Sequence, residues 1–190
     1  MNNDSLDRDG TIVSETDDEM VDKIEKVRFL PEALYYLRKI NDELDYELVM
    51  VTNQDGLGTE SWPVEQFQPA HDFILDTLKS EGIHFEAIHV DEHFAHENHP
   101  NRKPGIGMLT GYLEGGYDIS NSYVLGDRAT DVQLADNLGC KAIHIWPEKT
   151  THAELTTESW KEIYEFLRLS QREIEVKRKT NETDISIKLN

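Results

Sequence analysis

Two aspartates, Asp7 and Asp9, stand two residues apart in the stretch SLDRDGTIVSE at residues 5–15, directly before a Gly-Thr pair. Paired carboxylates on a tight turn can share a hydrolytic reaction, one attacking as an ionised nucleophile and the other moving the proton. Carboxylate oxygens are also the ligands that a hard cation such as Mg²⁺ prefers. Because such a pair occurs as readily on a solvated turn, its meaning depends on the residues that the fold brings beside it.

Short runs rich in β-branched residues alternate with helical patterns over most of the chain. The predicted strands are residues 46–51, 85–90, 121–126 and 141–146. The predicted helices are residues 31–44, 63–81, 105–116, 129–139 and 157–169. This alternation predicts an α/β fold, in which a parallel sheet carries helices on both faces.

Polar and charged residues stand just past the predicted strand ends, where open α/β sheets bind their ligands. They include Thr52, Asn53, Lys103, Asp127 and Asp131. Four basic residues of this acidic chain also fall at these ends, namely Arg8, Arg102, Lys103 and Arg128. A phosphate-binding pocket needs such local positive charge. The pattern therefore predicts Mg²⁺-assisted phosphoryl transfer through an aspartyl-phosphate, with a small phosphate compound as substrate.

The overall balance of charges and apolar residues narrows the possible partners. The formal net charge is -19 at pH 7, so nucleic acid is not an expected partner. No apolar stretch approaches the ~20 residues that span a bilayer, so we expect no membrane partner. The N-terminus shows no secretory signal and there is a single cysteine, Cys140. Both features predict a reducing, cytoplasmic location.

Four short motifs resemble, in order, those of the haloacid dehalogenase superfamily of phosphatases. They are DRDGT at 7–11, VTNQDG at 51–56, RKP at 102–104 and GDRATD at 126–131. The resemblance covers roughly residues 6–146 and implies a Rossmann-like, haloacid-dehalogenase-like sheet with a small cap or none.

The resemblance also implies roles for individual residues. Asp7 would be the nucleophile and Asp9 the general acid and base. The expected phosphate- and substrate-binding residues are Thr52, Asn53, Lys103, Arg8 and Glu15. Mg²⁺ would be held by Asp7, the backbone carbonyl of Asp9 and Asp127, with Asp131 behind these ligands. For Glu15 we expect contact with a cationic group of the substrate, and a surface carboxylate in an acidic run is the equally weighted alternative.

Within the superfamily, residues 47–63 and 121–139 resemble the histidinol-phosphate phosphatases most. In bacteria these phosphatases often form the N-terminal half of a bifunctional enzyme with imidazoleglycerol-phosphate dehydratase. EVKRKTNETDISIKLN at 175–190 resembles the opening strand of that dehydratase. We therefore predict a phosphatase domain at 1–168, and a linker with a truncated dehydratase-like start at 169–190. The full-length protein would be oligomeric through the missing domain.

These resemblances predict hydrolysis of L-histidinol phosphate to L-histidinol in histidine biosynthesis. One alternative is a phosphatase of the same superfamily acting on a sugar bisphosphate, of the heptose 1,7-bisphosphate type. Another is a regulatory module that accepts a phosphoryl group on aspartate without turning over. Asp9 discriminates against the last, because an acid/base residue speeds hydrolysis and a phospho-switch gains nothing from it.

Relatives commonly carry a zinc loop of three cysteines and one histidine just before the RKP motif. The loop at 89–104 has no cysteine, and Asp91, His93, His99 and Asn101 stand roughly in those places. Because structural zinc favours thiolate and imidazole ligands, we expect no structural zinc here and a solvated polar loop instead.

The two ends of the chain give weaker patterns. Leu6 is the only strand-like residue before Asp7, so MNNDS at 1–5 is not expected to form the central strand that the fold requires, and is read as a non-native lead-in. Residues 172–190 show a strand pattern with no partner elsewhere in the chain.

Overall fold

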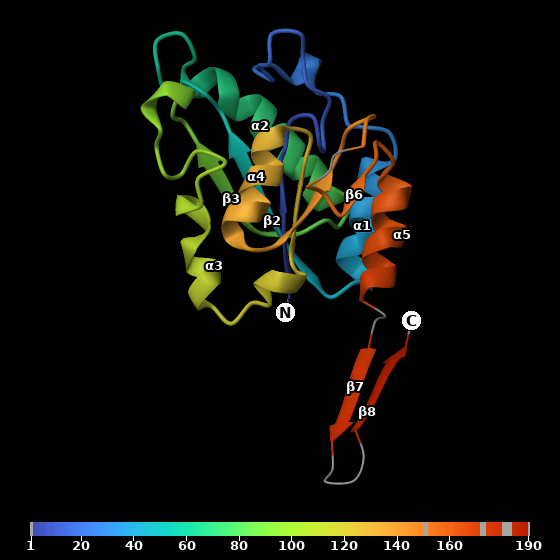
Figure 1. Cartoon of the computed structure of the whole chain (residues 1–190). Coiled ribbons are helices and arrows are strands. Elements are labelled where there is room, and N and C mark those ends of the chain that lie inside the picture. The colour runs from blue at the N-terminus through green and yellow to red at the C-terminus, as the bar shows by residue number, and fades with distance from the viewer. Residues whose placement is uncertain (1, 150–151, 172–173, 180–183, 190) are drawn as a thin grey trace.

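The computed structural model describes residues 2–149, 152–171, 174–179 and 184–189. Its body is a six-stranded sheet of order β3-β2-β1-β4-β5-β6, in which every neighbouring pair is parallel (Figure 1). The strands are β1 Asn2–Leu6, β2 Tyr46–Asn53, β3 Phe85–Asp91, β4 Tyr123–Gly126, β5 Lys141–His144 and β6 Leu155–Thr156. The four strands predicted at 46–51, 85–90, 121–126 and 141–146 are thus present, and the short β6 is an addition.

Helices cover both faces of the sheet, as the alternating pattern predicts. They are α1 Ala33–Glu43, α2 Val64–Ser80, α3 Thr110–Glu114, α4 Ala129–Leu138 and α5 Trp160–Ser170. Short 3-10 turns lie at Ile24–Lys26, Ala95–Glu97, Gly107–Leu109 and Ile119–Asn121. Residues of α1, α2 and α5 share one apolar core with Met50 of β2, whereas α4 packs on the opposite face with Val49. Successive residues of a strand face opposite sides of the sheet, so each buried strand contributes side chains to both apolar cores.

The order of the strands reverses between β1 and β4. From β1 the chain continues outward to β2 and β3, and it then returns to place β4 on the other side of β1. In a doubly wound sheet the crevice at this reversal, outside the carboxyl ends of the strands, is the usual ligand site. The chain therefore delivers the residues after Leu6 and after Gly126 to the two walls of one crevice.

The central strand β1 is built from polar residues, and the expectation that this end supplies no strand is wrong. Asn2–Leu6 pairs with β2 along its whole length and with β4 from Asp4 onward. Asn3, Asp4 and Ser5 are buried all the same. The backbone N–H of Asn3 donates to Ser122 Oγ at 2.9 Å, and that of Tyr123 donates to Asp4 Oδ1 at 3.2 Å. Ladder and side-chain bonds thus replace the apolar character that a buried strand normally has.

The C-terminal residues form a hairpin, which the sequence pattern missed. β7 Ile174–Lys179 pairs antiparallel with β8 Asp184–Leu189, so the expectation of a strand without a partner is wrong. Figure 1 shows this hairpin beyond the end of α5, apart from the body. α5 runs to Ser170, past the boundary predicted at 168, and the division into two domains stays a prediction. No helix in the described part of the chain is long and apolar enough to cross a membrane.

Candidate active site

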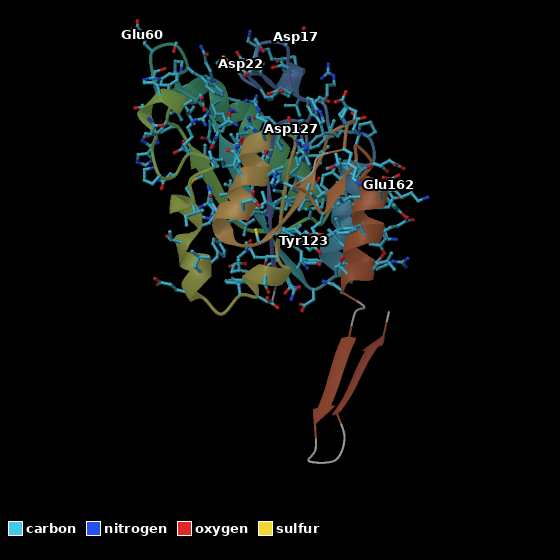
Figure 2. All side chains as sticks on the ribbon, in the orientation of Figure 1. Asp17, Asp22, Glu60, Tyr123, Asp127 and Glu162 are labelled. Atoms are coloured by element: carbon cyan, nitrogen blue, oxygen red, sulfur yellow. The ribbon has the colours of Figure 1, made fainter. Side chains whose placement is uncertain are left out.

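Six of the predicted site residues line one pocket at the carboxyl end of the sheet. The pocket has a volume of about 330 Å³, and its lining includes Asp7, Asp9, Glu15, Thr52, Asn53 and Lys103. Figure 2 shows Asp127 at this end of β4, with Tyr123 at the strand's other end. A larger open hollow of about 780 Å³ lies beside Tyr46 and Tyr123, and none of the predicted site residues lines it. The smaller pocket is therefore the candidate site.

Asp7 is the first residue after β1, and both of its carboxylate oxygens are held. The backbone N–H of Arg8 donates to Oδ1 at 2.7 Å, and Lys103 Nζ lies 2.7 Å from Oδ2. Burial raises the pKa of Asp7 to about 6, with a further contribution from Asp131, while Lys103 opposes the rise. Asp7 is thus fixed in orientation and close to a cation, as a nucleophile toward phosphorus must be.

Lys103 connects the carboxylates of two different strand ends. Its Nζ lies 2.7 Å from Asp131 Oδ1 as well as from Asp7, and the side chain is almost fully buried. Burial acts to lower the pKa of Lys103, but the carboxylates of Asp131 and Asp7 outweigh it, so this pKa lies above its ordinary value. Asn53 holds the backbone of Lys103 from both sides, accepting from its N–H at 3.0 Å and donating to its C=O at 3.3 Å. The lysine therefore stays charged beside Asp7.

Asp127 completes a cluster of three carboxylates with Asp7 and Asp131, whose nearest oxygens all lie within 4.8 Å of one another. Burial raises the pKa of Asp127 to about 7, and the charges of Asp7 and Asp131 add to the rise. Its Oδ1 is buried without a hydrogen-bond partner among the described residues. A buried carboxylate oxygen with no donor, facing other carboxylates, calls for a cation.

Glycine at position 10 makes room for this cluster. Gly10 has a φ of +69°, and a Cβ on it would overlap the carboxylate of Asp127, with Oδ1, the farthest of the three carboxylate atoms, only 2.6 Å away. Asp131 stands differently, because its Oδ2 accepts from the backbone N–H of Arg128 at 3.0 Å while its Oδ1 faces Lys103. The oxygen-only set of Asp7 and Asp127 fits Mg²⁺, with Asp131 placed behind it.

Asp9 lies on the pocket wall, and its carboxylate accepts hydrogen bonds from two side chains. Arg8 donates from Nε to Oδ1 at 3.0 Å and from Nη2 to Oδ2 at 2.8 Å. Gln54 Nε2 donates to the same Oδ2 at 2.8 Å and also to Thr52 Oγ1 at 2.8 Å. Gln54 thus ties the predicted acid/base residue to the predicted phosphate-binding threonine.

Arg8 does not line the pocket. Its side chain is fully buried, and its guanidinium is taken up by Asp9 and by His71 Nδ1, which lies 3.0 Å from Nη1. The geometry gives no support to the prediction that Arg8 contacts the substrate. Alternation at a strand end could have indicated this, because Arg8 stands between two residues that face the pocket.

Carboxylates line the mouth of the pocket. Glu15 is paired with Arg128, whose Nη2 also lies 3.4 Å from Glu19 Oε2. Asp18 contributes to the same lining, and Asp55 pairs with Arg102 at 2.8 Å. Figure 2 shows the segment that bears Asp17 and Asp22 above the end of the sheet where Asp127 lies. Glu15 is therefore at the pocket as predicted, with an arginine already beside it.

The loop after β3 gathers its own polar cluster. Ligating atoms of Asp91, His93 and His99 lie within 4.8 Å of one another. His93 Nδ1 is 2.8 Å from Asp91 Oδ1, and the two imidazole rings stack at 3.5 Å. Asn101 uses its backbone N–H to donate to His99 Nδ1 at 3.3 Å. The expectation that this loop holds no structural zinc stays a prediction.

Gln54, His71 and Trp62 are among the residues near the site that were not predicted from the sequence. Gln54 belongs to the motif VTNQDG at 51–56, so its position directly after β2 could have indicated that it lies near the site. His71 and Trp62 gave none, because each is a single side chain in or beside α2. Trp62 lines the pocket, and its buried Nε1 has no partner among the described residues.

Comparison with known sequences places the chain among phosphatases. The polynucleotide kinase 3 phosphatase family matches residues 4–158. "Histidine biosynthesis bifunctional protein HisB" of Spirosoma linguale is 48% identical over 203 residues, which cover 97% of this chain and 53% of that protein. The protein of the same name from Bacteroides fragilis is 46% identical over 195 residues, covering 97% and 52%. The chain thus spans about half the length of the curated relatives that it matches.

Comparison with solved structures agrees with the α/β fold of the superfamily. D,D-heptose 1,7-bisphosphate phosphatase from B. bronchiseptica, complexed with magnesium and phosphate, superposes with a TM-score of 0.76 at 23% identity. That match covers 89% of this chain and 99% of the other. The corresponding enzyme from Burkholderia thailandensis superposes with a TM-score of 0.57 at 20% identity, covering 88% and 99%. At these identities the likeness shows the fold alone.

Proposed function

Since the chain belongs to the polynucleotide kinase 3 phosphatase family, we propose that its pocket is a Mg²⁺-dependent phosphatase site that hydrolyses L-histidinol phosphate to L-histidinol. The observation that carries the reaction class is the setting of Asp7. Its two oxygens are held by a backbone N–H and by a buried lysine, at the crevice where the strand order reverses. The relatives named for histidine biosynthesis support the substrate and the pathway.

The first half of the reaction transfers the phosphoryl group to Asp7. A carboxylate oxygen of Asp7 attacks phosphorus, and the bond between phosphorus and the alcohol oxygen breaks with its electron pair on that oxygen. Asp9 gives its proton to the leaving oxygen, so that histidinol departs as the alcohol and not as an alkoxide. Lys103 and the hydroxyl of Thr52 bind the phosphoryl oxygens, where negative charge must be balanced. Asn53 holds the Lys103 backbone in place for this.

The second half returns the enzyme to its starting state. Asp9, now ionised, takes a proton from a water molecule as that water attacks the phosphorus of the aspartyl-phosphate. The bond between phosphorus and the Asp7 oxygen breaks, which releases inorganic phosphate and the free carboxylate. Asp9 thus donates a proton in the first half of the reaction and accepts one in the second.

Magnesium fits the residues present. Asp7, Asp127 and the backbone carbonyl of Asp9 would hold it, and the unpartnered Oδ1 of Asp127 is the observation that supports this. Bound there, the ion supplies positive charge to the phosphoryl oxygens and screens the carboxylates from one another. The charge of the ion would oppose the effect of burial and of the neighbouring carboxylates, and so lower the raised pKa values of Asp7 and Asp127 toward their ordinary range.

The acidic mouth favours a cationic leaving group. Histidinol carries an ammonium group, and Glu15 lines the pocket and would meet it by exchanging its pair with Arg128. A sugar bisphosphate would instead bring a second phosphate to this rim. The rim arginines, Arg102 and Arg128, are each already paired with a carboxylate. Like-charge contact at the rim therefore disfavours the bisphosphate alternative.

Steady-state phosphate release tests the proposal directly. Wild-type protein with Mg²⁺ should release phosphate from histidinol phosphate, and EDTA should abolish the release until Mg²⁺ is restored. Asp7→Asn should remove turnover by at least about 10³-fold, since the nucleophile is lost. Its thermal unfolding midpoint should stay at or above that of the wild type, because the amide also relieves the carboxylate repulsion.

Three results would count against the proposal. Turnover retained in Asp7→Asn refutes the aspartyl-phosphate mechanism. Faster hydrolysis of heptose 1,7-bisphosphate than of histidinol phosphate refutes the substrate assignment. A single stoichiometric burst of alcohol release without turnover would instead identify a phospho-accepting regulatory module.

The division at 168, the dehydratase-like start at 169–190 and the oligomeric full-length protein remain proposals that rest on the half-length match.

A further inference from the structure

The guanidinium of Arg8 is a buried charge that the proposed reaction does not use. The side chain is fully buried, yet it lies directly beneath the pocket wall. Its Nε and Nη2 donate to the two oxygens of Asp9, and Nη1 meets His71 Nδ1 at 3.0 Å. Phe67 lies under it, with Cζ of Arg8 5.0 Å from the ring centroid. Burying a guanidinium costs free energy unless acceptors satisfy its N–H groups. Here Asp9 and His71 supply those acceptors.

His71 acts in this unit as a neutral acceptor. Burial lowers its pKa to about 4, and the nearby charge of Arg8 adds to the drop. The imidazole is therefore uncharged at neutral pH, and because Arg8 can only donate, Nδ1 carries the lone pair and Nε2 the hydrogen. The ring stacks on Phe67 at 4.7 Å. Phe67 and His71 are four residues apart on α2, so one face of that helix positions both.

The hydrogen bonds leave one position open on the Asp9 carboxylate. Oδ2 accepts from Arg8 and from Gln54, which occupies both of its lone pairs. Oδ1 accepts only from Arg8 among the described residues. Oδ1 is therefore the oxygen with room for the proton that the reaction transfers. The fork of Arg8 fixes both oxygens at once, which a single point charge could not do.

We propose that His71 and Arg8 form a buried positioning unit, which holds Asp9 so that its Oδ1 delivers the proton to the leaving alcohol. His71 acts through Arg8, and Arg8 acts through Asp9; neither touches the substrate. This inference rests on the proposed phosphatase function and adds two residues that determine how well the general acid is aimed.

Substrates that differ in their need for a proton test the unit. In an alkyl phosphate such as histidinol phosphate or ethyl phosphate the leaving group is an alkoxide. An alkoxide leaves poorly without a proton, so its departure depends on the general acid. The phenolate of p-nitrophenyl phosphate leaves readily without a proton. Measured as kcat/KM, each reaction reports only the steps up to release of the alcohol or phenol. Misaiming Asp9 should therefore slow the alkyl phosphates selectively, whereas general loss of structure would slow all three.

Three variants separate positioning from packing. His71→Leu removes the acceptor for Arg8 Nη1 but keeps an apolar side chain against Phe67. His71→Gln keeps an acceptor, and Arg8→Lys keeps the charge but loses the fork. His89→Leu is the matched control, since His89 on β3 pairs with Oη of Tyr112 on α3 and has no contact with Arg8 in the described residues.

His71→Leu should lower kcat/KM for the alkyl phosphates by about 10- to 100-fold, part of the 10²- to 10⁴-fold that a general acid contributes. For p-nitrophenyl phosphate the drop should be less than about threefold on the same grounds. Arg8→Lys should show the same selectivity, His71→Gln should recover most of the alkyl activity, and His89→Leu should match the wild type.

The outcomes distinguish failure of the inference from failure of the function. Equal losses on alkyl and aryl substrates, or no loss in His71→Leu, overturn the inference while leaving the phosphatase intact. Failure of His71→Gln to recover alkyl activity also overturns it, because an acceptor alone should suffice. A wild-type protein that hydrolyses none of the three probes refutes the proposed function and the inference with it.

Discussion

Replacing Gly10 by alanine should weaken catalysis while leaving the fold largely intact. The added methyl group would overlap the carboxylate of Asp127, which is the far end of a rotatable side chain. Asp127 can turn away without moving the backbone, so the overlap is relieved by moving a proposed metal ligand. The main effect therefore falls on the metal site.

The magnitude has two separable parts. Gly10 has a φ of +69°, and a non-glycine residue in the left-handed region loses about 1–2 kcal/mol. This part should appear as lower stability. Displacing a carboxylate that holds or orients a metal typically lowers metal affinity or activity by about 10- to 100-fold. This second part should appear in the Mg²⁺ requirement and in kcat/KM.

Gly139→Ala provides the matched control. Gly139 ends α4 with a φ of +77°, and a Cβ there would meet nothing within 4 Å. Both variants thus carry the same kind of backbone strain, and only Gly10→Ala displaces Asp127. Urea denaturation should give similar losses of stability for the two. Phosphate release at varied Mg²⁺ should show a raised Mg²⁺ requirement and a lowered kcat/KM for Gly10→Ala alone.

Wild-type kinetics in Gly10→Ala would refute the reasoning, because Asp127 would then not be needed where the structure places it. Equal kinetic losses in both variants would trace the effect to backbone strain rather than to the carboxylate. Restoration of Gly10→Ala activity by high Mg²⁺ would agree with a weakened metal site.

Two further substitutions address substrate recognition and the buried strand. Glu15→Gln should raise KM for histidinol phosphate about two- to fivefold with kcat unchanged, which is the range expected for one partly exposed charge pair. Asp17→Asn is the control, because Asp17 is exposed and lies outside the pocket lining. An unchanged KM in Glu15→Gln would refute the proposed contact between Glu15 and the substrate. Burial raises the pKa of Asp4 well above its usual value, against the weaker opposing effect of its bond from Tyr123, so the folded state binds this proton more tightly than the unfolded chain. Stability is therefore lost as pH rises through the folded pKa, and Asp4→Asn should stabilise the protein by about 1–3 kcal/mol at pH 8. That advantage should shrink toward pH 4 in denaturant titrations; a pH-independent difference would show that Asp4 ionisation is not its cause.

The layout of the sheet and its site followed from local patterns. Runs such as YELVMV and the helices between them carry strong periodicity, so β2 to β5 were predictable within a few residues. Once the strands were placed, the strand-end rule brought Asp7, Lys103 and Asp127 together. Residue type then sufficed, because few arrangements bring a lysine and several carboxylates into one acidic crevice.

What the sequence could not predict depends on contacts between distant residues. β1 has no apolar pattern, and its place becomes clear only when Ser122 and Tyr123 supply partners for Asn3 and Asp4. His71 belongs to α2, and nothing in its neighbours along the chain points to a guanidinium that comes from residue 8. Polar residues that are buried by pairing leave no periodic signal, so single-sequence patterns pass over them.

The polar character of β1 has a consequence for folding kinetics. This strand comes before the other strands of the sheet in the sequence, yet it occupies the centre of the sheet, and the residue that bonds to Asp4 lies 119 residues further along. Early collapse driven by apolar side chains gives a strand of Asn, Asp and Ser little reason to stay in place. Pairing residues so far apart in sequence costs loop-closure entropy before any favourable contact forms. This cost slows folding. Asp7, the proposed nucleophile, directly follows this strand, so activity should return on refolding only after β1 has inserted between β2 and β4.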